Sequence, residues 1–127
     1  MKKLTQSKPK QSNGVFKTVL PNGLTVILKE NHNAPVATFS CWYRVGSRQE
    51  KPGYTGISHW VEHMLFKGTP KFPGRSADRL ISREGGAWNG GTWLDFTYYY
   101  ETLPIEKFDL ALELEARGYD WVEKEVA

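Results

Sequence analysis

The stretch His59-Trp60-Val61-Glu62-His63 predicts a helix that carries reactive groups on one side. Residues four apart lie one above the other on an α-helix, and residues three apart share the same side. Both imidazoles and the carboxylate of Glu62 are therefore expected to point into one sector. Two imidazoles make half of a tetrahedral zinc site, and a neighbouring carboxylate can take a proton from zinc-bound water.

Large apolar side chains surround this motif, and they predict a largely buried helix. They are Ile57, Trp60, Val61, Met64, Leu65 and Phe66. A buried group of two histidines and a glutamate costs free energy unless a metal or other partners compensate. The flanks therefore favour a metal site over the alternative, a polar patch on a helix surface. The order His-x-x-Glu-His is itself a signature of zinc-dependent hydrolysis.

Before the motif, the sequence predicts strands. Residues 15–20 and 24–28 read as a hairpin around the turn Pro21-Asn22-Gly23. Residues 36–45 alternate, and one set of positions is wholly apolar or aromatic: Ala37, Phe39, Cys41, Tyr43 and Val45. This set is expected to face the helices. His32 falls in a loop and is interpreted as a solvated residue.

After the motif, the helix is expected to end near Lys67-Gly68, and Ser76 is expected to cap a second helix over residues 77–83. Two strands are predicted over residues 87–89 and 95–103. Pro104 is expected in the first turn of a last helix that runs from residue 105 to about residue 117.

The last helix has one wide apolar face, which includes Phe108, Ala111 and Leu112. Glu115 is the exception on this face, because it places a carboxylate where buried apolar side chains are expected. The order of elements, with strands grouped beside helices, predicts an α+β fold: a two-layer sandwich of mostly antiparallel sheet with helices packed on one face.

Composition limits the remaining possibilities. The 127 residues allow one domain, and the net charge is +3. Four lysines precede residue 15, so residues 15–127 carry a net charge of −1. Residues 1–14 are interpreted as a disordered basic leader, and nucleic acid is not expected as a partner.

The single cysteine, Cys41, excludes an intrachain disulfide. No stretch is long and apolar enough to predict a membrane span. The N-terminus lacks the apolar segment of a secretory signal, so a cytoplasmic location is expected, or a periplasmic one if the start is trimmed.

Several separate stretches resemble the pitrilysin family of metallopeptidases, which includes insulysin and the mitochondrial processing peptidase. They are Gly56 to Thr69 with the motif, Leu20-Pro21-Asn22-Gly23-Leu24-Thr25-Val26, Trp42-Tyr43-Arg44-Val45-Gly46-Ser47-Arg48, Gly85-Gly86-Ala87-Trp88-Asn89-Gly90 and Tyr100-Glu101-Thr102-Leu103-Pro104. The resemblance implies the same two-layer fold and a chain in which residues 15–127 form the N-terminal part of a peptidase domain, truncated at the C-terminus.

The resemblance also implies the site. Glu62 would be the general base, His59 and His63 would be zinc ligands, and the third ligand would be a glutamate roughly 75 residues after His63. Only 64 residues follow His63, so this ligand is not expected in the chain. Glu115 is the best internal substitute, although a structural ion pair with Arg79 or Arg83 explains it better. Glu113 and Glu125 are weaker candidates.

Members of this family bind substrate as an added strand at a sheet edge. The matching residues here are Asn89 and Gly90, although Asn-Gly is also a common turn signal. The family closes the active site with a second homologous half or a partner subunit. A peptide or protein substrate and such a second half are the expected partners.

The sequence therefore predicts a zinc-dependent metalloendopeptidase domain that hydrolyses peptide bonds through zinc-activated water, and that is weakly active or inactive alone. One alternative is a non-catalytic subunit that resembles the peptidase, which would not need Glu62. Another is a structural zinc module, which would usually need more cysteines than Cys41. Manganese or cobalt could replace zinc at such ligands.

Overall fold

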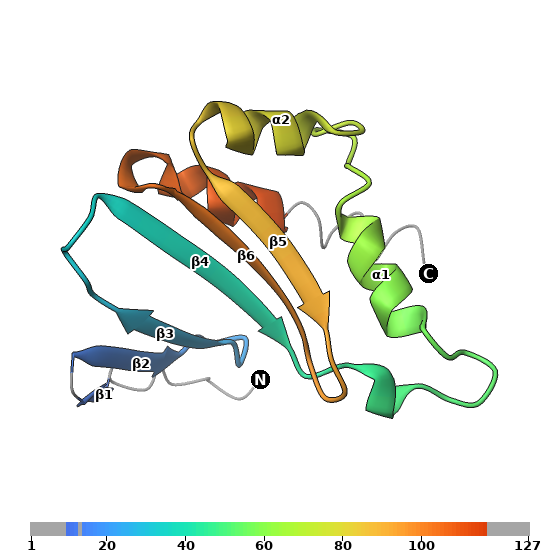
Figure 1. Cartoon of the computed structure of the whole chain (residues 1–127). Helices are drawn as coiled ribbons and strands as arrows, with labels where there is room; N and C mark the ends of the chain where they lie inside the picture. The colour runs from blue at the N-terminus through green and yellow to red at the C-terminus, as the bar shows by residue number, and fades with distance from the viewer. Residues whose placement is uncertain (1–9, 13, 117–127) are drawn as a thin grey trace. The chain divides into compact units, whose positions relative to one another are not determined.

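The computed structural model describes residues 10–12 and 14–116, which fall into two compact units, Met1–Ala34 and Pro35–Ala127. Each unit has its own antiparallel three-stranded sheet (Figure 1). The sequence predicted one unit from residue 15 onward. The boundary between the two units lies later in the chain than residue 15, because the predicted hairpin pairs within its own sheet rather than with the following strands.

The first unit is a meander of β1 (Lys10–Ser12), β2 (Val15–Val19) and β3 (Thr25–Lys29). The predicted hairpin is present, and Val15 pairs with Lys29 at its open end. The interpretation of residues 1–14 as a disordered leader is wrong for Lys10–Ser12, because their backbone pairs with β2. Polar side chains do not prevent this pairing, since the ladder is made by backbone groups. Residues 1–9 and 13 lie outside the described residues.

The second unit contains the predicted strand β4 (Val36–Tyr43), followed by β5 (Ala87–Thr92) and β6 (Thr97–Pro104). The strand order is β4-β6-β5, so β5 lies at an edge of this sheet as described. Alternate residues of β4 are half-buried and exposed, as the sequence predicted. Val45 is the exception, with 51% of its surface exposed, because the strand ends before it.

Helices cover one face of this sheet (Figure 1), which confirms the α+β class. They are α1 (Ile57–Leu65), α2 (Ser76–Arg83) and a helix over residues 108–116 that follows the 3₁₀ turn η2 (Ile105–Lys107). The core joins α2, β6 and the last helix through Ala77, Ile81, Leu103, Ala111 and Leu114. No helix within the described residues is long and apolar enough to cross a membrane.

Several local expectations need correction. Ser76 is the first residue of α2 rather than its cap, and its side chain makes no capping hydrogen bond. Pro104 ends β6 instead of starting a helix. On the last helix Leu112 is 42% exposed, whereas Leu114 is buried. The helix begins at residue 108, three residues later than predicted, after a 3₁₀ turn.

The motif helix α1 is less buried than its apolar flanks suggested. Ile57 and Trp60 are 42% and 55% exposed. Only the side with Ser58 and Glu62 is fully buried. A groove of about 350 Å³ runs along α1, and its lining includes Val61, Leu65, Tyr43 and Tyr99.

Candidate metal centre

The start of α1 is fixed by Glu50, eight residues before Ser58. The carboxylate of Glu50 accepts hydrogen bonds from the backbone N–H of Gly56 at 2.8 Å and of Ser58 at 3.0 Å. Gly56 is the N-cap residue and has a φ of 90°, a conformation that glycine adopts without strain. The bonds from Gly56 and Ser58 lower the pKa of Glu50. Glu50 thus caps the start of α1 from outside the helix.

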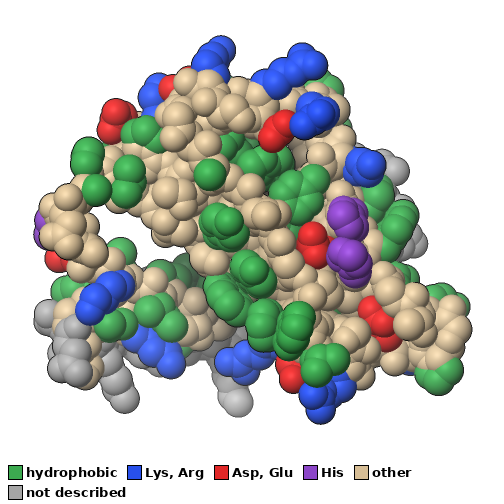
Figure 2. Space-filling model, viewed as in Figure 1, with side chains coloured by type: hydrophobic (Ala, Val, Ile, Leu, Met, Phe, Trp, Pro, Cys, Tyr) green, Lys and Arg blue, Asp and Glu red, His purple; other side chains and the backbone are tan. Residues whose placement is uncertain are grey.

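His59 and His63 lie on the same side of α1, one turn apart. Their Nε2 atoms are 3.0 Å apart and their ring centroids 4.5 Å apart. Both histidines are exposed. Figure 2 shows two histidine side chains adjacent at the surface with a carboxylate beside them. The spacing of the motif therefore produces the expected juxtaposition.

Glu62 belongs to the same group but is buried, with 6% of its surface exposed. Its Oε2 atom lies 4.0 Å from Nε2 of His59. One ligand atom from each of the three residues falls within 4.8 Å of the others, and the described residues contain no other such group. Two imidazoles and one carboxylate are a donor set that suits zinc.

The distances can be compared with those that zinc requires. Zinc–nitrogen bonds of about 2.0–2.1 Å in a tetrahedron place two ligand nitrogens roughly 3.3 Å apart. The observed 3.0 Å between the Nε2 atoms is close to this edge. The residues therefore fit a zinc ion with small side-chain adjustments, and the exposure of the histidines leaves room for further ligands.

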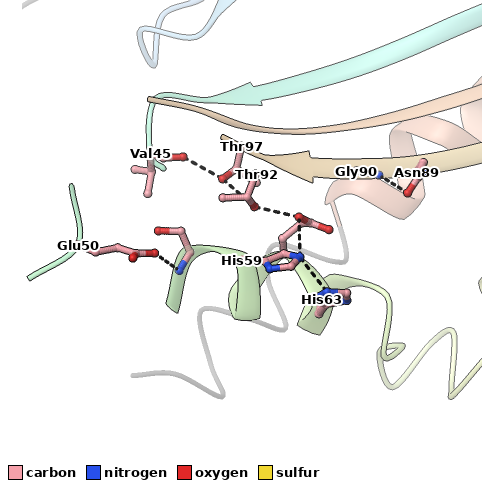
Figure 3. Close-up of polar contacts among 10 residues, drawn as sticks. Val45, Glu50, His59, His63, Asn89, Gly90, Thr92 and Thr97 are labelled. Atoms are coloured by element: carbon pink, nitrogen blue, oxygen red, sulfur yellow. Dashed lines mark hydrogen bonds and ion pairs between the residues drawn. The ribbon is translucent and has the colours of Figure 1, made fainter. Parts of the chain in front are cut away.

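A threonine pair at the end of the β5–β6 hairpin holds Glu62, and sequence reasoning missed it. Thr92 Oγ1 donates to Glu62 Oε2 at 2.9 Å. Thr97 pairs with Thr92 across the two strands and donates to the carbonyl of Val45 at 2.9 Å. Figure 3 shows these contacts running from Val45 to the carboxylate next to His59. No sequence signal pointed to Thr92, because the contact joins residues 30 positions apart.

Glu115, the suggested substitute ligand, is not a member of this group. Its Oε1 accepts a hydrogen bond from the hydroxyl of Tyr43 at 3.0 Å. Burial raises the pKa of Glu115. The expected ion pair with Arg79 or Arg83 is not found among the described residues, and Arg83 pairs with Glu84 instead.

The two weaker candidates also lie elsewhere. Glu113 pairs with Lys71. Glu125 lies outside the described residues.

Glu101 is a second buried carboxyl group that the sequence analysis did not single out. Only 2% of its surface is exposed, and its Oε2 has no hydrogen-bond partner among the described residues. Burial, with the negative charge of Glu115, raises the pKa of Glu101 to about 8. Glu101 and Glu115 both line a cavity of about 30 Å³.

Asn89 and Gly90 lie within β5 rather than in a turn. They pair with Tyr100 and Tyr99 of β6, so the turn interpretation of Asn-Gly is wrong. Asn89 Oδ1 accepts a hydrogen bond from the N–H of Gly90 at 2.9 Å (Figure 3). Alternation along the strand places Asn89 on the opposite sheet face from Thr92. In the sheet as described, Asn89 and Gly90 lie on an edge strand.

Comparison with known proteins identifies the family to which this fold belongs. The profile of the family described as "Insulinase (Peptidase family M16)" matches residues 25–118. The chain belongs to this family. The match contains α1 and the β5–β6 hairpin, and it confirms the resemblance that the sequence stretches suggested.

Curated relatives support the assignment. An uncharacterized zinc protease of Streptomyces coelicolor is 36% identical over 100 residues, which cover 79% of this chain and 22% of the relative. A probable mitochondrial-processing peptidase subunit beta of Arabidopsis thaliana is 37% identical over 97 residues, which cover 76% of this chain and 18% of the relative. The chain thus spans about a fifth of the length of these relatives.

Solved structures share the fold. A protease from Helicobacter pylori superposes with a TM-score of 0.73 at 34% identity, over 87% of this chain and 26% of that chain. The periplasmic protease PqqL from Escherichia coli gives a TM-score of 0.80 at 24% identity, over 89% of this chain and 13% of that chain. The second likeness concerns the fold alone.

Proposed function

We propose that this chain forms the zinc-binding part of a metalloendopeptidase that hydrolyses peptide bonds in peptides or proteins. The observation that carries the proposal is the group of His59, Glu62 and His63, each of which offers one ligand atom within 4.8 Å of the other two. The relatives named zinc protease support zinc as the metal.

The two histidines would hold the metal through Nε2, the atoms that face each other in the structure. Zinc, when bound, polarises a peptide carbonyl and lowers the pKa of a water ligand toward 7. Both histidines lie on a regular helix whose first turn is capped by Glu50. A rigid helix holds two ligands at a fixed separation, which lowers the entropic cost of binding.

Glu62 would act as the general base. Its carboxylate is buried beside the histidines and would take a proton from the attacking water, then give it to the leaving amine. Water thereby adds across the peptide bond, with the hydroxyl on the acyl carbon and the hydrogen on the nitrogen. The hydrogen bond from Thr92 keeps Oε2 on the side of the histidines.

The third ligand and the surface that closes the site would come from polypeptide beyond the described residues. Two imidazoles alone leave positions open on a tetrahedral metal. A second homologous half or subunit would supply the closing surface, and the edge of β5 near Asn89 and Gly90 would pair with the substrate backbone. The isolated chain is therefore expected to be weakly active or inactive.

The test is a calorimetric zinc titration of the purified 127-residue chain. His63→Ala removes one proposed ligand, and His32→Ala is the matched control, because His32 is an exposed histidine that pairs only weakly with Glu30 at 3.8 Å. Zinc binding that His63→Ala abolishes and His32→Ala leaves unchanged supports the site. Equal binding by both variants would refute it.

A quenched-fluorescence peptide assay on the zinc-loaded chain tests the role of Glu62. Glu62→Gln is expected to keep zinc affinity and to lose about 10²- to 10⁴-fold of whatever hydrolysis the wild-type chain shows, the usual contribution of a general base. A non-catalytic subunit would bind zinc without any hydrolysis that depends on Glu62. Turnover unchanged in Glu62→Gln would exclude this carboxylate as the base.

A further inference from the structure

One oxygen of Glu62 has two neighbours that matter for its orientation. Oε2 accepts the hydroxyl of Thr92 at 2.9 Å, and the same atom lies 4.0 Å from Nε2 of His59. The sheet therefore holds this oxygen on one side, while the imidazole faces it on another (Figure 3).

The direction of the hydrogen bond from Thr92 follows from counting hydrogens. Each threonine hydroxyl has one hydrogen to donate. The hydroxyl of Thr97 lies 2.9 Å from the carbonyl of Val45 and 3.4 Å from the hydroxyl of Thr92. A carbonyl can only accept, so the hydrogen of Thr97 goes to Val45. A carboxylate likewise can only accept, so the hydrogen of Thr92 goes to Glu62.

The positions of both threonines are set by the sheet rather than by the motif helix. Thr92 is the last residue of β5 and Thr97 the first of β6, and the two form the closing pair of the hairpin. Thr97 is buried, with 6% of its surface exposed. The donor to Glu62 is thus anchored through Val45 to the segment that follows β4.

We propose that Thr92 is a positioning residue for Glu62, which it holds in the one orientation that points Oε2 toward the histidines. This role rests on the proposed function, in which Glu62 is the base. A buried carboxylate that loses its hydrogen-bond donor loses a restraint on its side-chain rotamer and is left with an unsatisfied oxygen. Loss of the hydroxyl should therefore disorder Glu62 without removing a zinc ligand.

Two variants of Thr92 and one control separate the effect of the hydroxyl from that of the rest of the side chain. Thr92→Val removes the hydroxyl and keeps the branched shape, whereas Thr92→Ser keeps the hydroxyl. Thr38→Val is the matched control, because Thr38 forms a hydroxyl contact of 2.9 Å with Thr102 in the same sheet, away from α1. All three retain His59, Glu62 and His63.

The first measurement is the χ1 rotamer distribution of Glu62, from three-bond scalar couplings in the NMR spectra of the full zinc-free chain. Wild type, Thr92→Ser and Thr38→Val are expected to show one dominant rotamer. Thr92→Val is expected to shift toward a mixture of the two χ1 wells that a helix permits, near 180° and −60°. A single unchanged rotamer in Thr92→Val would overturn the proposal.

The second measurement is peptide hydrolysis by the zinc-loaded chain. Thr92→Val is expected to lower kcat about 10- to 100-fold with KM little changed, and Thr92→Ser to restore most of it. Rotamer mixing without a fall in kcat would also overturn the positioning role. If wild type shows no hydrolysis, as expected of a chain without the third ligand and the closing surface, the rotamer distribution alone decides whether Thr92 holds Glu62, and the zinc titration tests the proposed function separately.

Discussion

Glu50 and Ser58 are joined by a hydrogen bond of 3.0 Å from the backbone N–H of Ser58 to the carboxylate of Glu50. The same carboxylate accepts the N–H of Gly56, so one side chain satisfies two N–H groups at the start of α1. Such groups have no partner within the helix itself. The loop before α1 thereby fixes where the helix begins, and with it the direction in which His59 and His63 point.

Glu50→Gln should lower the melting temperature and weaken zinc binding, because a neutral amide accepts these bonds less strongly than a carboxylate. The pKa of Glu50 is lowered in the folded chain by the bonds from Gly56 and Ser58. Its contribution to stability is therefore present above the unfolded pKa and is lost as the pH falls through the folded pKa. Thermal unfolding at pH 7 and in the acid range should show the variant and wild type converging in acid. A difference that persists at low pH would contradict this account.

Glu101 should make the free energy of unfolding depend on pH in the opposite direction to Glu50. Its pKa rises from 4.5 to about 8 on folding, mainly through burial, so the folded chain keeps a proton that the unfolded chain has released. The free energy of unfolding should therefore be greatest near and below pH 4.5 for this group and decrease up to about pH 8, by at most about 1.4 kcal/mol per pH unit.

Glu101→Gln removes this titrating group while keeping the shape of the side chain. Urea unfolding between pH 5 and pH 8 is expected to give a flatter pH dependence for Glu101→Gln than for wild type. Glu106→Gln, at an exposed position of η2, serves as the control and should retain the wild-type slope. Equal slopes for Glu101→Gln and wild type would count against a protonated Glu101.

Gly46→Ala should destabilise the second unit. A Cβ atom at this buried position would lie 2.2 Å from the carbonyl oxygen of Trp93 and 2.7 Å from that of Leu94. These are backbone atoms, which cannot swing aside, and they accept hydrogen bonds from Ser47 and Arg48. The expected loss is about 1–3 kcal/mol or more in the free energy of unfolding, measured in urea. Ser47→Ala is the control with little expected effect, since the bond from Ser47 uses its backbone N–H.

Ser76→Ala should be nearly neutral or slightly stabilising. The hydroxyl of Ser76 is buried and has no hydrogen-bond partner among the described residues. Replacing a true N-cap serine by alanine costs about 1 kcal/mol, whereas removing an unsatisfied buried hydroxyl recovers its desolvation cost. The free energy of unfolding of Ser76→Ala, measured by chemical unfolding, decides between a capping serine and an unsatisfied hydroxyl. A loss near 1 kcal/mol would restore Ser76 to the capping role that the sequence suggested.

The part of the site that lies within one helix could be predicted from sequence. The i, i+3, i+4 spacing of His59, Glu62 and His63 fixes their common side because helix geometry is regular. The alternation in residues 36–43 likewise fixed the buried face of β4, since a strand has a period of two. Local periodicity therefore specified both the helix face that carries His59, Glu62 and His63 and the sheet face that the helices cover.

The remaining parts depend on contacts that no local pattern encodes. Thr92 and Glu50 reach α1 from other segments, and their roles follow only from the docking of the hairpin and the loop. Glu101 could have been found, because it alternates with Leu103 on β6 and so shares its buried face. The aromatic run Tyr98-Tyr99-Tyr100 hides this alternation, since it is apolar at consecutive positions.

The bond between Thr92 and Glu62 spans 30 residues, whereas His59 and His63 are one helical turn apart. Contacts between nearby residues form with little loss of chain entropy, and distant contacts must first close a loop. We therefore expect the two halves of the candidate site to form at different stages of folding. The imidazole pair would form with the helix itself, and the restraint on the carboxylate only when the β5–β6 hairpin docks.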